Sequence, residues 1–254
     1  MHISIAAATV VATMFVSLRL APLFLFAPVF GSVKLPGHFR AFTVLGIAYL
    51  LTVALKLDAN AIPLDIVGFA SAAIGELLIG AVIAAVMMIG FAAFSFAGRL
   101  LDLQIGFGIA SLLDLNTQAR MPLIGTALSM MAVMMFYLTD GHHTVVRAIA
   151  ISFEKMPLAK GIASLDFSFL ISFGSALFSF GLILVAPVIL VLFLIDVGIA
   201  VMSRTMPQMN VFVLAISIKV FVGVLLLTFS IRYMSGIAGK IFETMFRVLE
   251  SVVS

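Results

Sequence analysis

Glu76 is the residue whose type and position point most directly to chemistry. It is the only charged residue in the apolar stretch 66–98. A carboxylate inside an apolar membrane helix is costly, so it usually faces a polar partner, a cavity or a proton path. A proton relay normally needs a chain of acids or histidines, and the only similar acid in another long apolar stretch is Asp196. We therefore expect Glu76 to make a polar contact that fixes helix position, with proton coupling as the alternative.

Five other charged residues stand inside or beside apolar stretches. We expect them, like Glu76, to make polar contacts within the membrane or between subunits. They are Arg99, Asp102, Asp196, Arg204 and Lys219.

Two consecutive histidines, His142 and His143, could in principle bind a metal with Asp140. Consecutive residues do not share a helix face, however, and Asp140 is the only further ligand nearby. We expect a turn cap after Thr139, with Gly141 supplying backbone freedom, and no metal site.

Catalytic and cofactor motifs are missing from the sequence. It has no G-x-S-x-G elbow, no complete phosphate-binding glycine loop and no cysteine. Cysteine nucleophiles and thiolate zinc sites are thus excluded. We expect neither catalysis nor a cofactor.

Methionines gather in one apolar stretch as two i,i+4 pairs. Their thioether side chains are flexible and could seal a channel around varied passengers. The alternative is ordinary apolar packing. The residues are Met130, Met131, Met134 and Met135.

The segment 98–121 is apolar but interrupted by glycines, and then becomes polar. Irregular backbone at membrane depth is tolerated only when it is buried in protein or lines a cavity. We interpret the segment as a loop between two apolar helices that could plug or gate a channel; a surface loop with an apolar anchor is the alternative. The candidate gate residues are Gly106, Phe107, Gly108, Ile109, Leu112, Leu113 and Asp114.

The composition restricts the elements that can position these residues. Hydrophobic residues make up 64% of the 254 residues and charged residues 10%, against roughly 45–50% and about 25% in soluble domains. The net charge of +3 comes from scattered lysines and arginines, which suits membrane-edge anchors better than a nucleic-acid-binding stripe. We expect an integral membrane or membrane-assembled protein without a cleaved signal peptide, and no nucleic-acid partner.

Apolar runs predict one all-α domain, residues 1–254, built of helical hairpins. The runs 41–55, 66–98 and 167–195 contain 15, 33 and 29 residues, whereas a membrane crossing needs about 20. Tilted and kinked helices, packed largely on other protein, would explain these lengths. Pro22 and Pro28 should break or kink the first helix. Residues 239–254 predict an amphipathic tail.

An ordered series of motifs resembles the family of flagellar biosynthetic proteins FliR, export-gate subunits of the type III secretion apparatus. Each motif is weak alone, but their order and spacing extend along nearly the whole chain. The matching stretches are Arg19 with 27–31, Pro36 and Arg40; GELLIG at 75–80; GRLLDLQIGFG at 98–108; Asp140-Gly141-His142; Ser152-Phe153 with Pro157-Leu158; and PQMNVF at 207–212 with Lys219.

The resemblance implies a single-copy subunit of a helical export gate in the bacterial inner membrane, within the flagellar basal body. Its partners would be FliP-type and FliQ-type gate subunits, FlhB-type and FlhA-type export proteins, membrane lipid and unfolded flagellar substrates. A loop of this subunit contributes to closure of the channel in such gates, and by position it would fall at 106–121.

The sequence also departs from the family pattern. Asp114-Leu115 stands where Asp-Pro is frequent, 214–218 lacks a common Gly-aromatic-Pro, and Asp196 stands where Asn is frequent. The homologous injectisome subunit is one alternative, although Asp140-Gly141-His142 looks more flagellar. A small-solute transporter with Glu76 and Asp196 as coupling acids is another, but we find no inverted repeat of broken segments.

Overall fold

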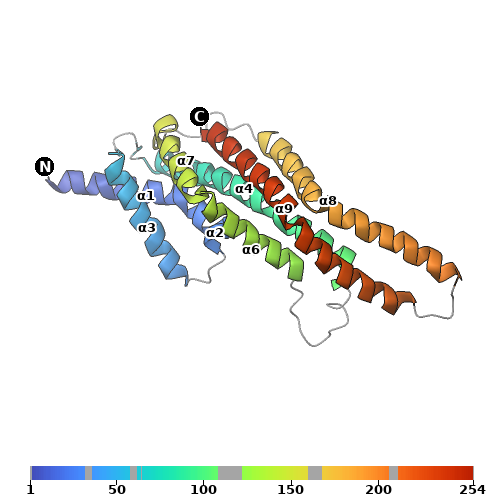
Figure 1. The fold of residues 1–254 in the computed structure, drawn as a ribbon. Helices are drawn as coiled ribbons and strands as arrows, with labels where there is room; N and C mark the ends of the chain where they lie inside the picture. The colour runs from blue at the N-terminus through green and yellow to red at the C-terminus, as the bar shows by residue number, and fades with distance from the viewer. Residues whose placement is uncertain are drawn as a thin grey trace. The chain divides into compact units, whose positions relative to one another are not determined.

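The described part of the chain is built from α-helices, as the sequence predicts (Figure 1). The computed structural model describes residues 2–31, 36–57, 62–63, 65–107, 122–159, 168–205 and 211–253. Its helices are α1 (His2–Phe26), α2 (Pro28–Gly31), α3 (Gly37–Ala54), α4 (Ile66–Ile105), α6 (Leu123–Leu138), α7 (Gly141–Lys155), α8 (Ser168–Thr205) and α9 (Val211–Val253).

Several of these helices are long and apolar enough to cross a membrane. Within the described residues five helices qualify, namely α1, α3, α4, α8 and α9, and the broken pair α6 and α7 would make a sixth. The 40 residues of α4 would extend about 60 Å, roughly twice the thickness of a bilayer core. The long runs in the sequence therefore correspond to single long helices.

The break predicted near Pro28 is confirmed, because α1 ends at Phe26 and α2 begins at Pro28, whereas Pro22 lies inside α1 without ending it. Two other predicted boundaries differ from the structure. Residues 98–105, predicted as the start of a loop, continue α4. The C-terminal tail is the end of α9, which continues through Gly236 and Gly239.

The described residues group into two compact units. The first comprises Met1–Ile89, Tyr137–Ile171 and Thr244–Ser254. Its α1 and α4 pack at backbone distance, because a Cβ placed on Gly80 would lie 2.0 Å from the Arg19 carbonyl oxygen. Phe15 of α1 also meets Phe69 of α4 edge to face at 5.0 Å.

The second unit comprises Gly90–Phe136 and Ser172–Glu243. Phenylalanines from α4, α6 and α9 form its aromatic core, with ring centroids 5.5–6.1 Å apart: Phe91, Phe94, Phe136 and Phe242. Glycines again bring helices close, since a Cβ on Gly98 of α4 would lie 2.3 Å from the Cα of Gly125 in α6. The single domain remains a sequence prediction.

Candidate functional site

Arg19 forms a buried charge centre in the first unit. Its side chain is fully buried in α1, and its Nε donates to Oε2 of Glu76 at 2.6 Å. Nη1 donates to the carbonyl oxygen and the hydroxyl of Ser152 at 2.9 and 3.1 Å, and Nη2 donates to the carbonyl oxygen of Met156 at 2.9 Å. The guanidinium also lies over the Phe153 ring, 4.2 Å from its centroid. The planar guanidinium has several N–H donors in a fixed arrangement and can reach all of these acceptors at once. The single ammonium group of a lysine could not.

Glu76 completes this centre from α4. Its Oε1 accepts a hydrogen bond at 3.1 Å from the backbone N–H of Ala159, which follows α7. Both carboxylate oxygens are thus engaged, and the ion pair joins α1 to α4 while Arg19 reaches the end of α7. This geometry favours the positional role for Glu76 over a proton relay.

Sequence reasoning did not single out Arg19 as the partner of Glu76. The signal was present, because each residue is a lone charge of opposite sign in its own apolar stretch. Buried charges in apolar surroundings are paired, so pairing the two would have been a sound prediction. Two of the other acceptors are the backbone carbonyls of Ser152 and Met156, which residue types do not indicate, and the third is the Ser152 hydroxyl.

Asp102 lies at the base of the candidate gate segment, in the second unit. Its buried carboxylate accepts the backbone N–H of Ile124 through Oδ1 and that of Gly125 through Oδ2, both at 2.9 Å. These amides belong to the first turn of α6, where backbone donors lack helical partners and a negative charge is favourable. Asp102 thereby ties the end of α4 to the start of α6, the helices on either side of residues 108–121.

Gly106 ends α4 in a conformation that favours glycine. Its φ is +101°, and its N–H donates to the carbonyl oxygen of Asp102 at 3.2 Å. An L side chain rarely adopts this backbone conformation. Gly106 and the half-buried Phe107 are the candidate gate residues that the structure describes; Gly108, Ile109, Leu112, Leu113 and Asp114 lie outside the described residues.

Asp196 and Lys219 form an ion pair between α8 and α9. The distance from Lys219 Nζ to Asp196 Oδ1 is 2.5 Å, and Gln104 of α4 donates to Asp196 Oδ2 at 3.1 Å. Two predicted contact residues therefore meet each other within the second unit. Gln104 stands two residues before Gly106, so this contact also holds the end of α4.

The remaining predicted contact residues and the predicted methionine face are exposed or half-buried. Arg99 lies exposed on α4 and Arg204 near the end of α8. On α6, the side chains of Met130 and Met134 are exposed, whereas Met131 and Met135 are half-buried. The exposed i,i+4 pair of methionines leaves a flexible apolar surface on this helix.

Apolar helices that are long enough to cross a membrane define this chain as a membrane protein, and a comparison with known proteins gives its family. The chain belongs to the family of bacterial export proteins, family 1, which it matches over residues 10–245. This confirms the resemblance drawn from its motifs.

Individual relatives of this family are similar to the chain over much of its length. It is 29% identical to the flagellar biosynthetic protein FliR of Pectobacterium carotovorum, covering 93% of this chain and 90% of the relative. It is 27% identical to FliR of Bacillus subtilis, covering 96% and 95%. It is also 29% identical to the Yop proteins translocation protein T of Yersinia pestis, over 65% and 64%.

Proposed function

We propose that this chain is a non-catalytic gate subunit of a flagellar type III export channel, through which unfolded flagellar proteins leave the cytoplasm. The observation that carries the proposal is its similarity to FliR proteins over nine tenths or more of both chains. The family as a whole consists of bacterial export proteins. The protein would be located in the bacterial inner membrane, at the flagellar basal body.

Exposed apolar surface supports a role inside an assembly. Only 6% of the apolar window of α9 and 22% of that of α8 is buried, compared with 61% for α4. Large side chains such as Phe193, Phe221 and Phe229 are more than half exposed. In the proposed gate, FliP-type and FliQ-type subunits and lipid cover this surface, with FlhB-type and FlhA-type proteins as neighbours and one copy of this chain.

Channel closure is assigned to the gate segment that begins at Gly106. Asp102 and the Asp196–Lys219 pair fix the described end of α4, and Asp102 also fixes the start of α6. A segment that closes a pore must return to the same position after each exported protein has passed, so the helix ends that flank it need to be held in place.

The direct test is deletion of the gene in its own host. We expect loss of filament assembly and of secreted flagellar subunits, both restored by the wild-type gene on a plasmid. Normal motility in the deletion strain would contradict the flagellar assignment.

The injectisome subunit is the second candidate, supported by the similarity to the Yersinia translocation protein T. That similarity covers about two thirds of each chain, whereas the flagellar relatives cover nine tenths. Loss of virulence-type secretion with intact motility in the deletion strain would select this candidate. A solute transporter is disfavoured, because the carboxylates of Glu76 and Asp196 are paired with Arg19 and Lys219.

A further inference from the structure

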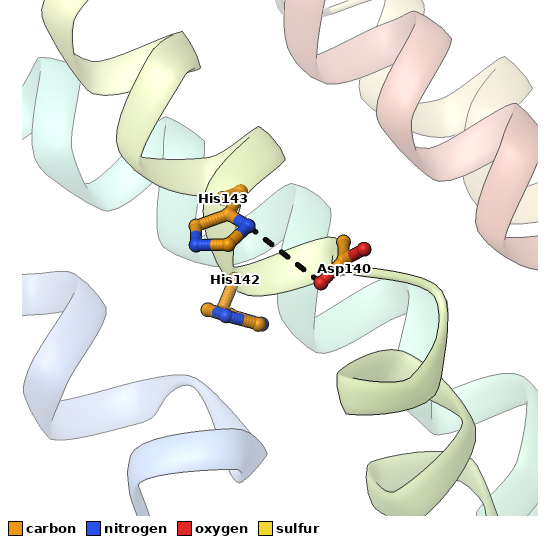
Figure 2. Close-up of side chains that lie close together, drawn as sticks. All are labelled: Asp140, His142 and His143. Atoms are coloured by element: carbon orange, nitrogen blue, oxygen red, sulfur yellow. Dashed lines mark ion pairs between the residues drawn. The ribbon is translucent and has the colours of Figure 1, made fainter.

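We propose that Asp140, His142 and His143 form a binding site for a divalent transition-metal ion of the zinc class. The three residues lie where α6 gives way to α7, and Figure 2 shows His143 turned toward Asp140 with His142 beside them. One ligand atom from each residue lies within 4.8 Å of the other two. The proposal does not depend on the proposed function.

The backbone of Asp140 holds two of the ligands in a single turn. Asp140 has a φ of +54°, its N–H donates to the Tyr137 carbonyl oxygen, and its own carbonyl oxygen accepts from His143 and Thr144 at 3.0 and 3.3 Å. The backbone freedom predicted for Gly141 is therefore needed at Asp140, a residue type that tolerates the left-handed region. The Asp140 side chain makes no capping hydrogen bond to α7, so the turn does not use its carboxylate.

The side chains approach one another more closely than their sequence spacing suggested. His143 Nδ1 lies 3.6 Å from Asp140 Oδ1, and the ring centroids of His142 and His143 are 4.1 Å apart. About three quarters of each of the Asp140 and His143 side chains is exposed, so an ion can enter from outside.

A second observation comes from His142 itself. Its Nδ1 atom is buried and has no hydrogen-bond partner among the described residues. An unpaired buried polar atom is unfavourable, and each such atom in a folded protein needs a physical reason. Only a metal ion bound at Nδ1 itself would give this atom its missing partner, so we place the ion on Nδ1 of His142.

The ligand types select the ion. Imidazole nitrogens with one carboxylate suit Zn²⁺, Co²⁺, Ni²⁺ or Cu²⁺, whereas Mg²⁺ and Ca²⁺ prefer oxygen ligands. Around a tetrahedral zinc with bonds of about 2.0–2.2 Å, ligand atoms lie roughly 3.3–3.6 Å apart. The ligand atoms would have to approach one another from as much as 4.8 Å, and the exposed Asp140 and His143 side chains have room to rotate. Three protein ligands leave one position for water.

The test is calorimetric titration of the full chain, in detergent or in its native complex, purified without a polyhistidine tag. We expect one Zn²⁺ per chain, competition by Ni²⁺ and no binding of Mg²⁺. His142→Ala and His143→Ala should each weaken Zn²⁺ binding by at least about tenfold, and Asp140→Asn should weaken it less. His38→Ala is the matched control, because it removes an exposed histidine from α3 and should leave binding unchanged.

X-ray absorption at the zinc edge of the wild-type chain provides a readout that needs no variant. We expect scattering from two imidazoles and two oxygen ligands, the Asp140 carboxylate and a water, at about 2.0–2.2 Å. Absence of imidazole scattering, zinc binding in His142→Ala and His143→Ala as tight as in the wild type, or a loss in His38→Ala as large as in these two variants would each mean an adventitious ion only and would overturn the proposal.

Discussion

Removal of one charge from the Arg19–Glu76 pair leaves the other charge buried and unpaired. Breaking such a pair typically costs about 3–5 kcal/mol, so Arg19→Met and Glu76→Leu should each sharply reduce recovery of folded protein. The double variant should recover more than either single variant, because no charge is then left unpaired. Thermal unfolding of the native complex in detergent compares the three variants with the wild type, and Arg99→Met, an exposed change on α4, is the control.

Glu76→Gln separates polarity from charge at the same position. Glutamine keeps an acceptor for the Ala159 N–H but removes the charge that faces Arg19, so we expect stability between wild type and Glu76→Leu. Export by gates that do assemble should continue. Arrest of proton-dependent export in a fully assembled Glu76→Gln gate would instead establish the relay role.

Gly80 tests the close packing of α1 on α4. Alanine there would place its Cβ 2.0 Å from the Arg19 carbonyl oxygen, which is backbone and cannot rotate away. We expect Gly80→Ala to destabilise the protein by about 1–3 kcal/mol. Gly46→Ala on α3 meets nothing within 4 Å, so the same substitution should be neutral or slightly stabilising there. Equal unfolding temperatures for the two variants would contradict this account of the contact.

At the scale of the element, Asp102 acts as a cap supplied to α6 by another helix. Asp102→Ala leaves the Ile124 and Gly125 amides without their acceptor, and we expect a loss of about 1–2 kcal/mol. Hydrogen exchange at these two amides should accelerate. Asp65→Ala removes a cap from the start of α4, where Asp65 accepts the Gly68 N–H, and should accelerate exchange there instead. Unchanged exchange at 124–125 in Asp102→Ala would count against the capping role.

The gate segment gives a second prediction at this scale. Short deletions within 106–113 should raise the leak of ions or small molecules through the assembled gate, because the apolar closure is shortened. Leak is measured in vesicles or cells that contain the complete complex. The Asp196→Asn variant should leak less than the deletions, since it loosens the base without shortening the segment. An unchanged leak in an assembled deletion gate would contradict the assignment.

Much of this element structure could be predicted from the sequence. Apolar runs located the centres of α4 and α8, because the length of an apolar run is a strong signal. The end of α4 was placed too early, because charges and glycines suggest a loop. Arg99 is exposed and Asp102 is used by α6, so neither charge interrupts the helix. The pairing of Arg19 with Glu76, 57 residues apart, is indicated by their opposite charges in apolar stretches, but the contacts with Ser152 and Met156 depend on tertiary packing that spacing along the chain does not encode.

At the scale of the whole molecule, the uncovered surfaces of α8 and α9 predict dependence on partners. Expressed alone, the chain should aggregate or be degraded, since such large apolar surfaces mark interaction sites. Coexpression with its neighbouring export genes should protect it. Native mass spectrometry of the purified complex should count one copy of this chain. A stable, monodisperse monomer from the chain expressed alone would contradict this prediction.

The Arg19 centre also has a consequence for biosynthesis. Glu76 follows Arg19 by 57 residues and Ser152 follows it by 133. At synthesis rates of roughly 5–20 residues per second, Arg19 is translated about 3–11 s before Glu76 and about 7–27 s before Ser152. The first helix therefore leaves the ribosome with an arginine that its own chain does not yet neutralise. Water, lipid headgroups or an insertion factor must shield that charge until the rest of the centre has been translated.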